Sequence, residues 1–270
     1  MFTKLLAYEI RSRYRADARS FGAFIVTIAV ASGIVAAGLP GLSGFTKSFI
    51  YILCALTPLA CAIAAMADYW KTLYGQRGYF TMSLPVSGAA IFWAKITRMV
   101  IECILALALA LGGAVAIASA AAWSDGISLA EYTAGPRALV AGMPTSTVVL
   151  MIAGQLILAM SWGVQGCAVM SIGAEGRFNH MGFGAPIIGF VLLYIVNQVL
   201  SAVGTFFLPL SITADGHFST EIMWTSFLAT TGTDSRPDVI GLGSYILVPL
   251  FALILGLWAS RSIEKHTSLR

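Results

Sequence analysis

Charged residues are scarce in this 270-residue chain: Asp, Glu, Lys and Arg together make up 10% of it, against about 25% in soluble domains. Six long stretches contain no charged side chain at all, and each has at least 20 residues. A helix crosses the hydrocarbon core of a bilayer with about 20 apolar residues. The sequence therefore excludes a sizeable soluble domain and predicts six membrane crossings, within residues 20–46, 48–67, 103–124, 138–174, 178–214 and 239–260.

The charge-free stretches also lack the alternation of polar and apolar residues that a membrane β-barrel requires. Residues 104–122, for example, are apolar almost without interruption. A backbone in lipid must satisfy its own hydrogen bonds, and a helix does this within one segment. We therefore predict an all-α membrane protein, with a single transmembrane domain over residues 1–270 and six transmembrane helices.

Motifs for nucleotide, metal or catalytic chemistry are missing as well. The chain has no Gly-Lys dipeptide and so no phosphate-binding P-loop, and it has no Cys-x-x-Cys or His-Glu-x-x-His. Its three histidines lie in three different loops or tails, and its four cysteines fall in or beside apolar runs. We predict no cofactor, metal site or nucleic-acid partner in this chain, and the sequence disfavours an intramembrane enzyme.

The basic residues are distributed unevenly between the predicted loops. The net charge is +4, and 13 of the 16 Lys and Arg residues lie on the side of the membrane that holds both termini. Cytoplasmic loops carry the excess of Lys and Arg. The distribution predicts a multi-pass membrane protein with both termini in the cytoplasm.

Residues 1–19 form an amphipathic segment. Phe2, Leu6, Ile10 and Tyr14 make an i, i+4 row, and most basic residues of the segment lie on other faces. This pattern is typical of a helix in the membrane interface, with its basic side toward anionic lipid head groups. The alternative is a basic tail that only sets the topology.

A few polar residues fall within the predicted crossings. Arg98 and Glu102 are four residues apart on one helix and can pair, either as a structural ion pair at a helix entrance or at the inner mouth of a pathway. Gln155, Asn197 and Ser201 are weak candidates for lining a substrate path, and the alternative is that they bond between helices. One acid near a helix end gives little support to an ion-coupled secondary transporter.

The predicted cytoplasmic loop at residues 68–98 carries the most specific pattern. Gly75 and Gly78 allow a tight turn, Pro85 stops a preceding helix, and Ser87 is a suitable N-cap for the next one. The aromatic segment between these breaks, at 79–84, is predicted to be a docking surface. The alternative is that its rings only anchor the loop at the membrane interface.

In this loop the chain resembles the permease subunits of the ABC-2 class of bacterial ABC transporters. The resemblance rests on Gly-Gln-Arg-Gly-Tyr-Phe-Thr-Met-Ser-Leu-Pro-Val-Ser at 75–87, followed by Ile-Phe-Trp-Ala-Lys at 91–95. Residues 171–182 are similar to the family's short loop after the fourth crossing. Together with the six crossings and the amphipathic start, the resemblance covers nearly the whole chain. Gln76 and Arg77 depart from the family's pattern, because acidic residues are common at these positions in the family.

The resemblance implies the membrane subunit of an ATP-driven exporter, which is itself not an enzyme. Two copies, or this chain and a similar permease, would bind two separate ATPase subunits that hold ATP and Mg. The residues implied to couple the chain to its ATPases are Tyr79, Phe80, Leu84, Pro85, Glu175 and Arg177.

The cargo is left open by the sequence, since a drug, an antimicrobial peptide or a lipid-like molecule fits an apolar path. Membrane lipids are further partners. The alternative function is a structural or regulatory membrane protein that transports nothing.

Outside the membrane, aromatic residues in the predicted outer loop at 211–238 indicate short helices at the membrane surface.

Overall fold

A computed structural model describes residues 2–75, 78–83, 85–138, 140–182, 184–213, 215–231 and 236–265. The chain divides into two compact units. Unit 1 consists of Met1–Tyr69 and Trp93–Leu139, and unit 2 of Trp70–Phe92 and Val140–Arg270. The sequence predicts one transmembrane domain, and the structure adds this internal division.

The predicted all-α fold with six membrane crossings is confirmed. Among the described residues, six helices are long and apolar enough to span a bilayer, which makes this a multi-pass membrane protein. They are α1 Phe2–Ala36, α2 Leu42–Leu73, α4 Gly88–Ser124, α7 Thr145–Gly173, α8 Gly184–Phe207 and α10 Ser244–Lys265.

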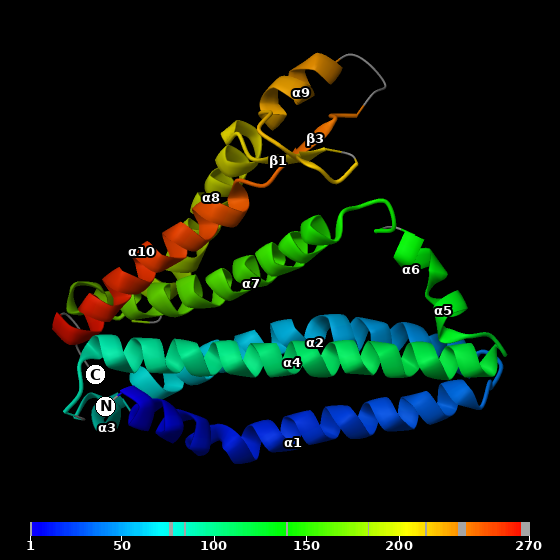
Figure 1. Ribbon diagram of the computed structural model, residues 1–270. Helices are drawn as coiled ribbons and strands as arrows, with labels where there is room; N and C mark the ends of the chain where they lie inside the picture. Colours follow the sequence, from blue (N-terminus) through cyan, green and yellow to red (C-terminus); the bar gives the residue numbers. More distant parts are fainter. Residues whose placement is uncertain are drawn as a thin grey trace. The chain divides into compact units, whose positions relative to one another are not determined.

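Unit 1 is built from α1, most of α2 and most of α4, which lie alongside one another (Figure 1). Buried apolar side chains from all three helices form its core, including Ile28, Ile50 and Ile117. Gly113 of α4 permits the close approach, since a Cβ there would lie 3.0 Å from Cδ1 of Ile28. The connection after α4 contains two short helices, α5 Leu129–Tyr132 and α6 Ala134–Ala138.

The N-terminal amphipathic segment is the first half of α1 and not a separate helix. No proline interrupts residues 2–36, so the helix continues for 35 residues, about 52 Å at 1.5 Å per residue. The predicted apolar row is on the outside, with Tyr14 67% exposed. The face packed in unit 1 instead carries Leu5 and Glu9. Such a distribution suits a helix surrounded by lipid, in which polar groups face the helix bundle.

Unit 2 is organised around α7, α8 and α10, which pack against one another (Figure 1). Glycines allow their backbones to come close. A Cβ on Gly204 of α8 would lie 2.6 Å from the backbone nitrogen of Ser244, at the start of α10. A Cβ on Gly154 of α7 would lie 2.8 Å from the ring of Tyr245. Small residues at such crossings are typical of helix packing in membranes.

The connection between α2 and α4 is shorter than the predicted loop at 68–98. Helix α2 continues to Leu73 and α4 begins at Gly88, so the connection is 74–87 and includes the one-turn helix α3, Gly78–Met82. Gly88 lies against the end of α10, because a Cβ there would be 2.8 Å from the backbone nitrogen of Glu264.

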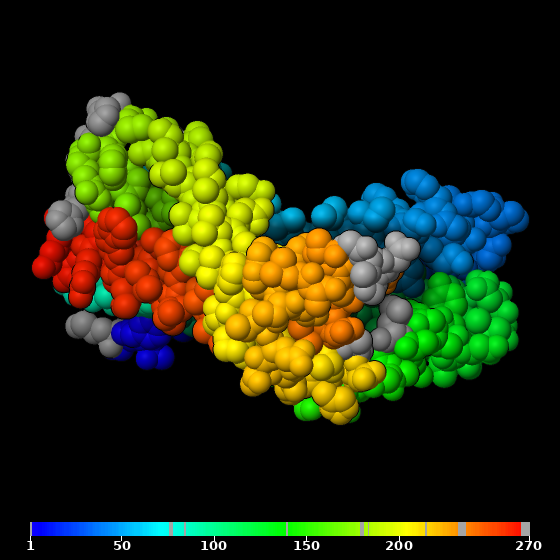
Figure 2. Space-filling model, turned by 90° about the horizontal axis from the view of Figure 1, so that it is seen from above, coloured from blue at the N-terminus to red at the C-terminus, as the bar shows by residue number. Residues whose placement is uncertain are grey.

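The segment predicted as an outer loop, 211–238, contains both strands and a helix. Strands β1 Ser211–Thr213, β2 Phe218–Ser219 and β3 Val239–Gly241 form an antiparallel sheet in the order β2-β1-β3. A short helix, α9 Met223–Thr230, confirms the prediction of helical structure here. Its Trp224 and Phe227 pack edge-on against Phe206 of α8, and Figure 2 shows α9 in orange beside the yellow end of α8.

Candidate functional site

The predicted docking segment presents two exposed aromatic rings. Tyr79 and Phe80 of α3 are 56% and 64% exposed. The Thr81 hydroxyl donates a hydrogen bond to the carbonyl of Thr72 at 3.0 Å, which fastens α3 to the last turn of α2. The two rings therefore project from a short helix that is hydrogen-bonded to the end of α2.

The docking segment is followed by the capped start of α4. Pro85 is exposed, and the Ser87 hydroxyl accepts a hydrogen bond from the backbone N–H of Ala90 at 3.3 Å. This confirms the prediction that Ser87 caps the following helix. Leu84, the remaining residue predicted to couple in this segment, lies outside the described residues, as do Gln76 and Arg77.

The second predicted coupling site lies between α7 and α8, at the 3-10 helix η1, Gly176–Met181. The Nε of Arg177 lies 2.7 Å from a carboxylate oxygen of Glu175. Glu175 is buried, whereas the Arg177 side chain is 57% exposed and its guanidinium stacks 4.7 Å from the centre of the Phe178 ring. The buried carboxylate thus holds an exposed cation in a defined orientation.

Both predicted coupling sites lie at one end of unit 2. The Ser262 hydroxyl donates to the carbonyl of Ser171 at 3.3 Å, which joins the end of α10 to the end of α7 just before η1. Two residues further along α10, Glu264 meets Gly88 at the start of α4. We call this end of unit 2 the η1 end.

Unit 1 contains a buried ionic network that joins its three long helices. Arg98 of α4, 1% exposed, is its centre. Its guanidinium lies 2.7 Å from a carboxylate oxygen of Glu102 and 3.0 Å from one of Asp68 on α2. On α1, Glu9 lies 2.9 Å from Nζ of Lys95 and 3.9 Å from Nε of Arg98.

The network extends along α1 to a second arginine. Arg13 lies 2.8 Å from a carboxylate oxygen of Asp68 and 3.5 Å from one of Asp17. Glu9, Arg13 and Asp17 succeed one another at intervals of four residues, so they share one side of α1. Charged groups in a membrane bundle are expensive unless they face its interior and pair, and both conditions are met here.

The pairing of Arg98 with Glu102 agrees with the prediction from their spacing, while a role at the mouth of a pathway stays a prediction. Sequence reasoning missed Glu9 as a partner of Lys95. The signal was available in the row of Leu5, Glu9 and the two charged residues that follow at the same spacing, but the segment is interpreted from its sequence as an interfacial helix with its basic side toward lipid head groups.

The predicted substrate-path residues do not gather in one place. Asn197 of α8 is buried and donates from Nδ2 to Oε1 of Gln165 on α7 at 2.7 Å. Gln165 in turn donates from Nε2 to the carbonyl of Val248 on α10 at 3.1 Å. Ser201 lies one turn further along α8 and is half-buried, and Gln155 is exposed. For Asn197 the geometry matches the alternative of a bond between helices.

In the part of the chain that the structure describes, no three or more His, Cys, Asp or Glu side chains form a group that could hold a metal ion. None of the four cysteines is in a disulfide, and Cys54 and Cys167 are buried. The four acids of the ionic network in unit 1 lie next to three cationic side chains, so their charges are paired within the protein.

No model of a known protein family, no curated protein and no solved structure matches this chain.

Proposed function

We propose that the chain is the transmembrane subunit of an ATP-driven exporter of the ABC-2 class in the bacterial cytoplasmic membrane. ATP and Mg are held by two separate ATPase subunits, and the chain pairs with a second copy or a similar permease. The observation that carries the proposal is the exposed pair Tyr79 and Phe80 on a short, well-fastened helix. Aromatic side chains that project from a fixed element supply the apolar contacts with which protein partners dock.

The charge distribution supports placing α3 in the cytoplasm. The loop with α3, the η1 loop and both termini share one side by the even count of crossings, and this side holds 13 of the 16 basic residues. By the positive-inside rule that side is cytoplasmic. A soluble ATPase has access to Tyr79 and Phe80 only there.

The attachments of α3 give the proposal a mechanism. The Thr81 hydroxyl of the short helix is bonded to the last turn of α2, and Ser87 caps α4 five residues after α3 ends. A movement of the ATPase surface against the two aromatic rings would therefore act directly on the end of α2, and on α4 through the short connection. Tilting of packed helices as rigid bodies is a common form of such switching, and here it opens and closes a path for an amphipathic cargo.

The η1 loop offers a second contact in the proposal. Arg177 is exposed and held in place by Glu175, so it can pair with an acidic group on the ATPase. Surface ion pairs contribute little free energy. We therefore expect this contact to set orientation and the aromatic pair to provide most of the affinity.

Purification from native membranes in mild detergent tests the proposal. We expect the wild-type chain to elute with a P-loop ATPase that mass spectrometry identifies and with ATP hydrolysis in the same fraction. The double variant Tyr79→Glu, Phe80→Glu should insert normally but lose both.

The matched control is Phe218→Glu, which introduces a charge at an exposed aromatic residue of the small sheet. This variant should keep the ATPase. If the wild-type chain elutes without an ATPase, the exporter proposal fails and a structural or regulatory membrane protein becomes the better account.

A further inference from the structure

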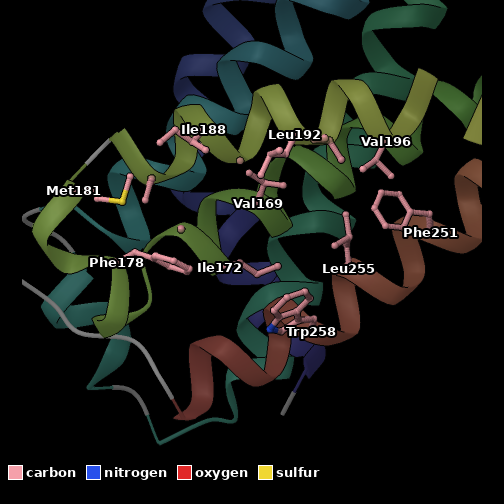
Figure 3. Close-up of a pocket in the computed structure, with 14 residues that line it drawn as sticks. Val169, Ile172, Phe178, Met181, Ile188, Leu192, Val196, Phe251, Leu255 and Trp258 are labelled. Atoms are coloured by element: carbon pink, nitrogen blue, oxygen red, sulfur yellow. The ribbon is translucent and has the colours of Figure 1, made fainter. Parts of the chain in front are cut away.

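Unit 2 contains an apolar cavity of about 300 Å³ between α7, α8, α10 and η1 (Figure 3). Every described lining residue is apolar or glycine, and the indole N–H of Trp258 is the only polar side-chain group among them. Gly189 helps to shape the cavity, because a Cβ there would lie 2.5 Å from Cγ1 of Val169. A cavity with this lining selects a ligand with hydrocarbon chemistry.

The length of the cavity matches one half of a bilayer. On α8 the lining extends from Ala185 to Val196, a rise of about 17 Å at 1.5 Å per residue. The hydrocarbon of a single leaflet is about 15 Å thick, half of the total of about 30 Å. Phe178 and Met181 line the cavity at the η1 end, where α8 begins (Figure 3).

Charged groups lie around the same end. Phe178 lines the cavity, and the guanidinium of Arg177 stacks on that ring. The pair with Glu175 uses the Nε of Arg177, and the Arg177 side chain stays 57% exposed. On α10, the exposed Arg261 follows Trp258 by one turn, near Glu264 and Lys265. These three cations and two acids give the η1 end a net positive charge.

We propose that the cavity is a lipid site: it takes one acyl chain of an anionic phospholipid from the leaflet at the η1 end, with the head group at Arg177. The chain fills the apolar lining over the depth of one leaflet, and the terminal nitrogens of Arg177 donate to the phosphate. Trp258 places an indole beside the bound lipid, as aromatic residues do near head groups. The lipid phosphate and an acidic group of the ATPase would compete for Arg177, but the lipid proposal does not depend on ATP-driven transport.

Fluorescence quenching by brominated lipids tests the site in the full-length chain. A variant that keeps only Trp258, with the other five tryptophans replaced by phenylalanine, is reconstituted in vesicles of phosphatidylcholine and phosphatidylglycerol. Bromine is placed on the acyl chains of one lipid class at a time. We expect quenching by the anionic lipid to saturate at a low mole fraction, with about a fivefold preference over the neutral one.

Substitutions separate the acyl chain from the head group. Arg177→Gln should abolish the preference for the anionic lipid while quenching persists. Leu192→Phe fills the cavity and should reduce quenching, whereas Ile195→Phe, at a similarly exposed position of α8 outside the lining, should not. Because no ATPase is present, failure here is distinguishable from failure of the exporter proposal.

Two outcomes would overturn the lipid site. One is quenching that simply follows the bulk fraction of either brominated lipid, which indicates ordinary surrounding lipid. The other is protection of Trp258 from both lipids together with cross-linking between two chains, which indicates that a second copy covers the cavity. Quenching of the variant that keeps only Trp258 distinguishes these outcomes from the proposed lipid site, and no substitution in the cavity is needed.

Discussion

In unit 1 the long helices share buried charged side chains, whereas in unit 2 they approach through glycines and share a short chain of neutral amides. Seven charged groups on α1, α2 and α4 form the ionic network around Arg98. In unit 2, Gly204 and Gly154 allow close backbone contact, and one hydrogen-bonded chain runs from Asn197 to Val248. Both arrangements hold helices together in a solvent where apolar side chains gain little by meeting.

The two units differ in the free energy that is needed to separate their helices. A buried charge that loses its partner is left in a medium of low dielectric, so separating α1 from α4 near Arg98 carries a large penalty. A glycine contact has no comparable penalty, and interhelical amide bonds in membranes are weak on average. We therefore expect α1, α2 and α4 to move as one body and α8 to shift more readily against α7 and α10.

Removing Arg98, the central cation of the ionic network, should cause the largest loss of stability. Arg98→Met leaves Glu9, Asp68 and Glu102 without their shared partner, and breaking a buried pair in this way costs about 3–5 kcal/mol. Thermal unfolding in detergent measures the loss of stability. The control is Arg11→Met, which removes an exposed arginine of α1. Equal stability of the two variants would show that the network does not hold the helices together.

A glycine substitution in unit 2 should have an intermediate effect. A Cβ at Gly204 meets backbone atoms of Gly243 and Ser244 below 3.0 Å, and these cannot rotate away as a side chain can. We expect Gly204→Ala to destabilise the chain by about 1–3 kcal/mol, as overpacked cores are. Gly33→Ala on α1 is the control, since nothing lies within 4 Å of a Cβ there; a similar loss in both would refute the close-contact account.

The hydrogen-bonded amides of Asn197 and Gln165 should contribute least to the stability of the chain. Asn197→Leu removes the donor to Gln165, and single interhelical hydrogen bonds in a membrane protein contribute about 0.6 kcal/mol on average and about 1.7 at most. The comparison variant is Gln155→Leu, where an exposed amide is replaced and no loss is expected from a broken helix contact. A loss for Asn197→Leu as large as that for Arg98→Met would remove the contrast between the two units.

The number and position of the crossings could be predicted because each one corresponds to a continuous run of about 20 residues without charge. The Arg98–Glu102 pair and the Ser87 cap could be predicted for the same reason, since their partners are at most four residues apart. The contacts of Arg98 with Asp68 and Glu9 could not, because they depend on which faces of three helices meet.

Two other features of the fold were not predicted, for related reasons. The strands at 211–241 have two or three residues each, too few for an alternating pattern to be recognised. The continuity of α1 was missed because the composition changes near Ser20 while the helix does not end. A change in polarity marks where the surroundings of a helix change and does not by itself mark where the helix ends. Even proline does not always end a helix here, since Pro58 and Pro249 lie inside α2 and α10.

Site-specific cross-linking in intact membranes shows whether Phe80 contacts an ATPase. A photoreactive amino acid replaces Phe80 in one variant and Phe218 in another, and the chain is irradiated in its native membrane. The account predicts an adduct between position 80 and a P-loop ATPase, and none from position 218. It is contradicted if position 80 yields no such adduct, or if a reagent that cannot cross the membrane labels it from outside intact cells.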